Sequence, residues 1–304
     1  MSYLQHRKNL VLPIALIGGA VFNKWMGHLT FLSPYLIFAM LFITYCKLSL
    51  KDLKVGKFEF SLLVVQMVLS AVTYFSLFWL DHTVAEGVFI CVFVPTATAA
   101  PVITAMLGGN ISKVATYSLL CNFFVALVGP VVLAVIGDRA DYTFLQSFSL
   151  ILAQVAPLLL LPLASAMIVR YFVPKLHHVV ASHQQLSFYM WAISLFIVVG
   201  SCVSFAINAW TPGSTWVMVS LAVGAFVACI VQFVVGRRLG KRWGDRVSCA
   251  QSLMQKNTVL AVWLAMAYMN PIASIGPAAY IAWQNIVNSW QLVRHDSRIW
   301  KDKL

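Results

Sequence analysis

The sequence predicts an all-α polytopic membrane protein with ten transmembrane helices. Three observations lead to this fold class. First, 61% of the residues are hydrophobic and only 10% are charged, whereas soluble domains carry about 25% charged residues. Second, the apolar residues fall into segments long enough to cross a bilayer, which takes about 20 residues each. Third, the basic residues between these segments follow the positive-inside rule.

The apolar segments follow one another along nearly the whole chain. They lie near residues 10–28, 31–47, 58–80, 85–107, 111–136, 144–172, 186–208, 214–236, 247–268 and 272–293. Arg7 and Lys8 precede the first segment, which lacks an obvious small-residue cleavage site, so we expect a retained helix and not a signal peptide. The short loops and the lack of processing signals favour a bacterial inner membrane protein.

The basic residues test this count of helices. With the N-terminus placed inside, Lys24 and Arg139 fall in outside loops and Lys256 falls within the ninth segment. Every other lysine and arginine falls in an inside loop or tail. An extra or missed helix would invert all later loops, so the pattern predicts ten spans with both termini in the cytoplasm. The net charge of +12 is therefore expected at the membrane surface, and we expect no nucleic-acid partner.

The ninth segment contains the stretch Gln255-Lys256-Asn257-Thr258. A charged side chain at the centre of a bilayer costs about 2.5–3.5 kcal/mol. The acidic residues and histidines fall in or beside loops, so we expect no carboxylate at the same depth as Lys256. Two structural roles compete with a functional one: the lysine could snorkel to the interface, or it could cap the carbonyls of a half-helix. Its distance from both ends of the segment argues against snorkelling.

The fourth segment carries Pro95 and Pro101 with Thr96 and Thr98 between them, and Thr104 follows. Each proline removes a backbone donor and disrupts the helix. A simple proline kink is the structural alternative. When the chain is divided into residues 1–140 and 141–304, however, the interrupted segment is the fourth in each half. This arrangement is expected of an inverted-repeat transporter, whose site lies between two discontinuous helices.

Other deep polar residues are weaker candidates. Gln66 lies in the third segment, and Gln284, Asn285 and Asn288 lie in the tenth. Polar residues of this kind often only join helices. The six cysteines form no C-x-x-C pair, which indicates buried apolar residues and no metal site.

In three places the sequence resembles the bile acid:sodium symporter family. The matching stretches are residues 95–101 (PTATAAP) with Gly108-Gly109-Asn110, residues 254–261 (MQKNTVLA), and Asn270-Pro271 with Trp283-Gln284-Asn285. The resemblance implies two inverted five-helix repeats that form two domains. A panel domain would comprise residues 10–47 and 144–208. A core domain would comprise residues 58–136 and 214–293, with helices 4 and 9 broken and crossing. Family members typically move organic anions with sodium bound behind this crossover.

The sequence departs from the family at the sodium sites. Ala100 and Pro101 stand where the family has a Ser-Asn pair, and Val114 and Ser118 stand where it has two hydroxyls. Ser252 aligns with an acidic residue of the family. Lys256 falls near a family glutamine, whereas Gln66 matches one. Because sodium requires a cage of oxygens that usually includes charge, these departures indicate degenerate sodium sites.

These observations predict that the Lys256 ammonium replaces bound sodium. The candidate ion- and substrate-binding residues are Lys256, Gln255, Asn257, Thr258, Ser252, Thr96, Thr98, Pro101, Gln66, Ser118 and Asn285. The expected function is secondary active or facilitative transport of a small organic anion by alternating access, independent of sodium. Proton coupling through Lys256 is an open option, and no organic cofactor is expected.

Three alternatives remain open. The first is a sodium-coupled organic anion symporter with a rearranged ion site. The second is an intramembrane hydrolase, because Ser252 and Lys256 are spaced i,i+4 and a lysine at that spacing could activate a serine. No carboxylate pair or metal-ligand set supports an enzyme. The third is a pore, although the sequence contains no charged ring or filter repeat.

Overall fold

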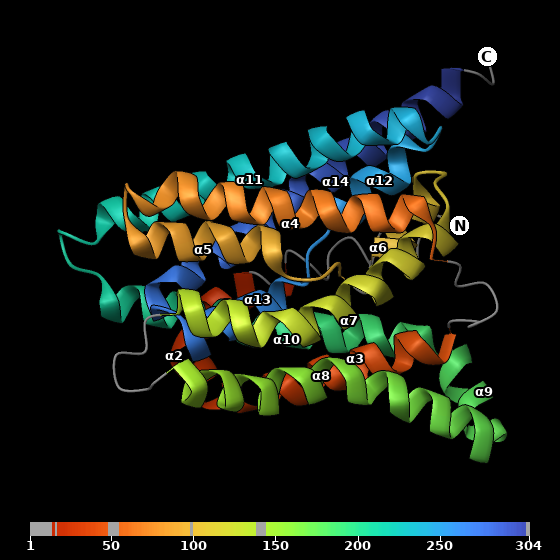
Figure 1. Cartoon of the computed structure of the whole chain (residues 1–304), viewed down its shortest axis with the longest axis horizontal. Helices are drawn as coiled ribbons and strands as arrows, with labels where there is room; N and C mark the ends of the chain where they lie inside the picture. The colour runs from red at the N-terminus through yellow and green to blue at the C-terminus, as the bar shows by residue number, and fades with distance from the viewer. Residues whose placement is uncertain (1–13, 16, 48–54, 98–99, 138–143, 302–304) are drawn as a thin grey trace.

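The computed structural model describes residues 14–15, 17–47, 55–97, 100–137 and 144–301, and over these residues the protein is all-helical (Figure 1). The helices up to residue 137 are α2 (Asn23–Met26), α3 (Ser33–Lys47), α4 (Lys57–Phe78), α5 (His82–Phe93), α6 (Ala100–Met106) and α7 (Ile111–Ile136), with the 3-10 helix η1 (Gly27–Leu32) joining α2 to α3.

The later part of the chain continues in the same way. Its helices are α8 (Phe144–Phe172), α9 (Pro174–Ser182), α10 (Gln184–Ala209), α11 (Thr215–Arg242), α12 (Arg246–Met254), α13 (Thr258–Tyr268) and α14 (Ile275–Lys301), and the 3-10 helix η2 (Pro271–Ser274) precedes α14.

Both expected interruptions are present. The fourth predicted segment is divided into α5 and α6, and the ninth is divided into α12 and α13. In the described residues, four helical stretches are long and apolar enough to cross a membrane: Asn23–Cys46, Lys57–Phe78, Ile111–Ile136 and Thr215–Arg242. Four shorter helices are also apolar: His82–Phe93, Leu160–Phe172, Ala192–Asn208 and Thr258–Tyr268. The count of ten spans stays a prediction.

The structure differs from the expected boundaries at two places. No loop separates the first two predicted segments, because Gly27 keeps helical angles (φ −55°, ψ −37°) and η1 connects α2 directly to α3. Pro34 near the start of α3 is compatible with this continuity, because the first turn of a helix does not need its N–H. The region between the sixth and seventh predicted segments contains an unpredicted helix, α9, which begins at Pro174.

The helices form two packed sets, and extensive packing of α7 against α8 joins them. Helix α3 packs against α8 and α10, and α2 also contacts α10. Helix α11 packs against α5, α12 and α14, while α4 packs against α5 and α7. In Figure 1, α4 and α11 lie along one edge of the molecule and α8 along the opposite edge, with α13 between them. Most residues of the broken helices α5, α12 and α13 are buried.

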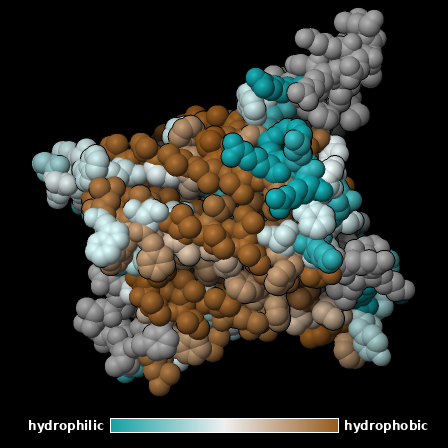
Figure 2. All heavy atoms as spheres, turned by 45° about the horizontal axis from the view of Figure 1, so that its top comes forward, coloured by the Kyte–Doolittle hydropathy of each residue, from teal (hydrophilic) through white to brown (hydrophobic). Residues whose placement is uncertain are grey.

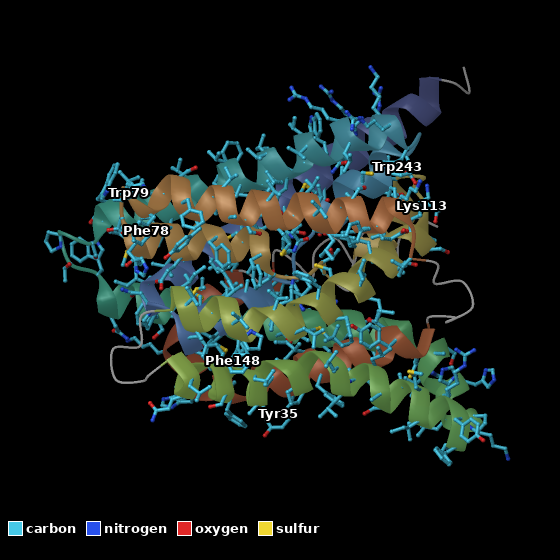
Figure 3. The ribbon with its side chains drawn as sticks, viewed as in Figure 1. Tyr35, Phe78, Trp79, Lys113, Phe148 and Trp243 are labelled. Carbon is cyan, nitrogen blue, oxygen red and sulfur yellow. The ribbon has the colours of Figure 1, made fainter. Side chains whose placement is uncertain are left out.

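The outer surface is strongly apolar. Figure 2 shows a broad hydrophobic area across the middle of the face in view, with hydrophilic residues gathered toward its edges. Figure 3 shows Phe78 and Trp79 at one end of the helices and Trp243 with Lys113 at the other. Trp79 is 88% exposed. Aromatic residues at both ends of an apolar surface are typical of the two membrane interfaces.

Helix α5 approaches the start of α14 very closely. A Cβ atom built on Gly276 would lie 2.5 Å from the carbonyl oxygen of Gly87. A Cβ on Gly87 would in turn lie 2.5 Å from the carbonyl oxygen of Ala273. These neighbours are backbone atoms, which cannot move aside as a flexible side chain can. The two glycines therefore fix the distance between α5 and the η2–α14 corner.

We predict that Gly276→Ala lowers the melting temperature of the purified protein by several degrees. The added methyl group overpacks a backbone contact, and overpacking typically costs about 1–3 kcal/mol. Gly27→Ala is the matched control, because Gly27 is helical and nothing lies within 4 Å of its Cβ position. Equal melting temperatures for the two variants would show that the α5–α14 contact is not tight.

Candidate functional site

The break after α5 is caused by Pro95. Val94 has an extended backbone (φ −58°, ψ 154°), as expected for a residue before proline, where helical angles are sterically disfavoured. Pro95 also lacks the N–H that would continue the helix. Helix α6 begins at Ala100. Thr98, one of the predicted site residues, lies outside the described residues.

The break between α12 and α13 contains no proline. Gln255 (φ −76°, ψ 103°) and Asn257 (φ −72°, ψ 78°) leave the helical region. The side chain of Asn257 then caps α13, because its Oδ1 accepts a hydrogen bond from the backbone N–H of Leu260 at 3.2 Å. An Asn side chain at this position satisfies one of the free donors at a helix start.

The two extended segments pair with each other. Thr96 and Lys256 form an antiparallel bridge. The Ala97 N–H donates to the Gln255 carbonyl at 3.0 Å, and the Asn257 N–H donates to the Pro95 carbonyl at 2.9 Å. We call residues 94–97 and 255–257 together the junction. At each break, backbone N–H and C=O groups lose their hydrogen bonds within the helix. The other break supplies new partners for them, and buried backbone groups need such partners.

Lys256 is 1% exposed and lies at the centre of the junction. Its Nζ donates to the carbonyl oxygen of Val94 at 3.2 Å. This carbonyl is at the C-terminal end of α5, where the helix dipole is negative and favours a cation. The backbone N–H of Lys256 donates to Oε1 of Gln284, on α14, at 3.1 Å. The ammonium therefore caps a half-helix, which is the structural role named above, in a position that also joins the two breaks.

Gln66, on α4, holds the same helix end from the other side. Its Nε2 donates to the carbonyls of Phe93 at 2.9 Å and Val94 at 3.2 Å. The hydroxyl of Tyr117, on α7, donates to Gln66 Oε1. The Val94 carbonyl thus accepts from both Gln66 and Lys256, and it is a neutral oxygen. Among the described side chains, no carboxylate lies within salt-bridge distance of Lys256.

Hydroxyl groups complete the junction. Thr96 Oγ1 donates to the Ser252 carbonyl at 2.8 Å, and Ser118 Oγ donates to the Thr96 carbonyl at 3.3 Å. The Thr258 N–H donates to the Lys256 carbonyl at 2.8 Å. Two buried polar atoms here have no partner within the described part of the protein, namely Ser252 Oγ and Gln255 Nε2. Such groups are costly unless a ligand or water satisfies them.

Most of the predicted site residues come together in this way. Those joined to the junction by hydrogen bonds are Lys256, Gln255, Asn257, Thr258, Ser252, Thr96, Gln66 and Ser118. Pro101 lies half-buried in α6. Asn285 has no hydrogen bond to the junction; its Nδ2 donates to the Ile281 carbonyl of its own helix at 2.6 Å.

The geometry gives no support to serine activation by Lys256. Lys256 Nζ donates to the Val94 carbonyl, whereas Ser252 Oγ has no hydrogen-bond partner in the part of the chain that the structure covers. A nucleophile and its base are expected within about 2.6–3.2 Å of each other.

Sequence reasoning missed a second set of residues. Tyr280, on α14, donates from its hydroxyl to the Met254 carbonyl at 2.8 Å, and Gln232, on α11, donates to the Tyr280 hydroxyl at 2.8 Å. This pair satisfies a carbonyl at the C-terminal end of α12, and Gln66 with Tyr117 satisfies carbonyls at the C-terminal end of α5. In each half of the sequence, a glutamine in the third apolar segment is followed by a tyrosine in the fifth, and this repetition could have indicated the second pair.

The acidic residue Glu86 was placed beside a loop from the sequence. In the structure it belongs to α5 and is fully buried. Its Oε2 accepts a hydrogen bond from the Asn270 N–H at 3.1 Å, and its Oε1 lies 4.0 Å from His82 Nδ1. The N-cap Asp81, one turn earlier, caps α5 by accepting from the Val84 N–H.

Comparison with known proteins identifies one family. A model of the SBF-like CPA transporter family matches residues 28–279. This match spans both interrupted helices and the junction. No curated protein matches the chain.

We predict that Thr96→Val lowers the melting temperature by several degrees. The substitution keeps the side-chain shape but leaves the buried Ser252 carbonyl without the Thr96 hydroxyl, and an unsatisfied buried group costs about 1–3 kcal/mol. Thr44→Val is the matched control, because Thr44 Oγ1 makes a bond of the same length, 2.8 Å, to the Met40 carbonyl within its own helix. A shift no larger than that of the control would contradict a structural role for the contact between the breaks.

Proposed function

The chain belongs to the SBF-like CPA transporter family, and on that premise we propose that it is a secondary transporter for a small organic anion, in which the Lys256 ammonium takes the place of a bound sodium ion. The family and the apolar helices indicate an integral membrane protein. The proposed mechanism is alternating access without sodium, either facilitated or coupled to protons. The bacterial inner membrane is the proposed location, with both termini in the cytoplasm.

One observation carries this proposal: the ammonium of Lys256 is buried against the neutral Val94 carbonyl at 3.2 Å. A backbone carbonyl oxygen is also the kind of ligand that sodium prefers. Here the cation is attached to the protein. A cation tethered in this way would hold the two breaks together without a bound metal ion.

Electrostatics argues against a second cation at the same place. Two unit charges 4 Å apart repel by about 4 kcal/mol at an effective dielectric constant of 20. This is about a thousandfold in affinity, since each 1.4 kcal/mol is tenfold. No carboxylate among the described side chains pairs with Lys256 to offset the repulsion. We therefore favour sodium-independent transport over a rearranged sodium symporter.

We propose two inverted five-helix repeats, residues 1–140 and 141–304. Matching contacts support this division. Asp81 caps α5 and Asp245 caps α12, with 2.9 Å hydrogen bonds from the N–H groups of Val84 and Ser248. The Gln66–Tyr117 pair donates a hydrogen bond to a carbonyl at the C-terminal end of α5, and the Gln232–Tyr280 pair does the same at the C-terminal end of α12.

The proposed motion takes place between a panel domain (residues 10–47 and 144–208) and a core domain (residues 58–136 and 214–293). The packing of α3 against α8 and α10 is consistent with the panel, and the packing of α11 against α5, α12 and α14 is consistent with the core. The extensive contact of α7 with α8 then lies between the two domains. The hydrogen bonds of the junction lie within the core domain. In this mechanism the junction moves as one unit while the panel stays fixed.

The anion preference follows from the positive ends of half-helices. Helix α13 starts at Thr258, two residues after Lys256, and the N-terminus of a helix favours negative charge. The unsatisfied Gln255 Nε2 is a buried donor in the same region. Together these groups favour an anionic substrate over a cationic one.

We predict that proteoliposomes containing the parent protein take up a labelled organic anion equally in sodium and in choline buffers. The probes are a bile acid, a short-chain monocarboxylate and a dicarboxylate. Lys256→Met should lower the initial rate at least about tenfold, because it removes the tethered cation. Lys57→Met is the control, since Lys57 is exposed at the start of α4. Uptake that requires sodium, or full uptake by a folded Lys256→Met variant, would contradict the proposal.

A further inference from the structure

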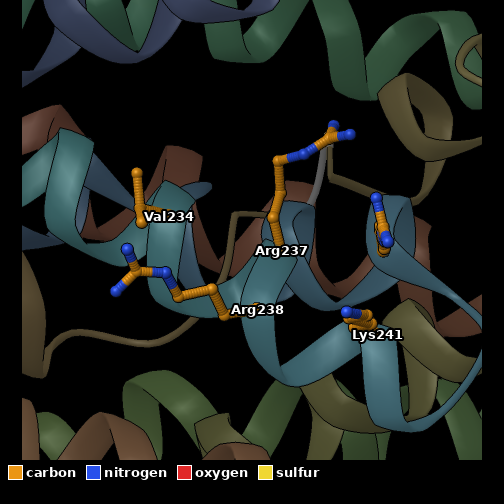
Figure 4. A pocket seen from close by; sticks show the side chains of 5 residues that line it. Val234, Arg237, Arg238 and Lys241 are labelled. Atoms are coloured by element: carbon orange, nitrogen blue, oxygen red, sulfur yellow. The ribbon is translucent and has the colours of Figure 1, made fainter.

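We propose that a hollow at the basic end of α11 binds the phosphate group of an anionic membrane lipid. The hollow has a volume of about 330 Å³ and is lined by Val234, Arg237, Arg238, Lys241 and Arg246 (Figure 4). It lies at the α11–α12 turn, on the side that the positive-inside rule assigns to the cytoplasm. This inference does not depend on the proposed transport function.

Two of the cations at this hollow are like charges on neighbouring turns of α11. Arg238 and Lys241 are spaced i,i+3, so their side chains are neighbours on one helix face. Like charges at this spacing are destabilising unless an anion lies between them. Among the described residues, no carboxylate lies within salt-bridge distance of Arg238, Lys241 or Arg246.

The one acidic residue in the α11–α12 turn is engaged elsewhere. Oδ1 of Asp245 accepts from the Ser248 N–H at 2.9 Å, which caps α12. Its Oδ2 lies 3.8 Å from Nζ of Lys113, on α7. Among the described residues, Arg238, Lys241 and Arg246 are therefore not paired with a carboxylate, and a ligand with several anionic oxygens suits them. Phosphate suits arginine in particular, because a planar guanidinium can bind two of its oxygens at once.

The position of the hollow favours a lipid phosphate over a free one. Val223, Val227 and Val231 form an exposed apolar stripe on α11, at 55%, 52% and 40% exposure. Their spacing of four residues keeps them on one face, which continues to Val234 and Arg238. The distance from Val223 to Arg238 along the helix is about 22 Å at 1.5 Å per residue. This length exceeds half of a hydrocarbon core of about 30 Å, so acyl chains can lie along the stripe beneath the headgroup.

Aromatic rings support the arginines beside the hollow. The Arg237 guanidinium carbon lies 5.6 Å from the centre of the Phe233 ring, and the Arg294 carbon lies 4.5 Å from the Trp290 ring. The Phe233 and Trp290 rings are themselves in edge contact at 6.0 Å. Cation–π contacts of this kind orient guanidinium groups, and Trp290 is a residue type that prefers the headgroup level.

The test is the melting temperature of the detergent-purified protein, titrated with three probes. Dioctanoyl phosphatidylglycerol carries acyl chains and a phosphate, dioctanoylglycerol carries the acyl chains alone, and sodium phosphate carries the phosphate alone. We expect the first probe to raise the melting temperature of the parent, because a ligand that binds only the folded state stabilises it. The other two should give no comparable rise at the same concentrations.

A pair of double variants assigns the effect to the hollow. Arg238→Gln with Lys241→Gln should raise the half-maximal concentration of phosphatidylglycerol about tenfold, since each basic residue near a membrane surface adds to anionic lipid binding. Lys57→Gln with Arg170→Gln removes the same charge from exposed positions on α4 and α8, and should change that concentration less than about twofold.

Three results would overturn the inference. Equal stabilisation by dioctanoylglycerol would show that only the acyl chains bind. An equal loss in both double variants would show a general charge effect without a site. If sodium phosphate raised the melting temperature of the parent to a plateau over the same concentrations as the lipid, the hollow would bind free phosphate. The proposal of a lipid ligand would then be wrong.

Discussion

The pairing of two interrupted helices is the contact on which the rest of the structure depends. A helix broken inside a membrane protein exposes backbone donors and acceptors that no water can satisfy. Here Ala97 donates to Gln255, and Asn257 donates to Pro95. Neither break would be stable alone. The close α5–α14 approach at Gly87 and Gly276 and the Asn257 cap place the two breaks within hydrogen-bond reach of each other.

Lys256 adds charge to this pairing. Its ammonium and the Gln66 amide both donate to the Val94 carbonyl. A carbonyl has two lone pairs, so it can accept both bonds. The cation thereby lies at the negative end of α5, where the helix dipole favours positive charge. A tethered cation at this helix end is consistent with the proposed replacement of sodium.

Much of the fold and most of the candidate site could be predicted from the sequence. Pro95 and the polar stretch around Lys256 indicated both breaks, because proline and buried charge leave local signals. The partners of Lys256 could not be predicted. Val94 contributes only a backbone carbonyl, which every residue possesses. Gln284 and not Asn285 contacts Lys256, because the rotation of α14 depends on tertiary packing. The continuous α2–η1–α3 run was missed for a similar reason: Gly27 can adopt either helical or turn angles.

The measurement that tests the central claim most directly is the melting temperature of the parent and of Lys256→Met in sodium, potassium and choline chloride at equal ionic strength. A bound ion stabilises the folded state by mass action. If the Lys256 ammonium occupies the place of the ion, the parent shows the same melting temperature in all three salts and the variant melts lower. A rise in the parent that is specific to sodium would contradict this account and establish a sodium site.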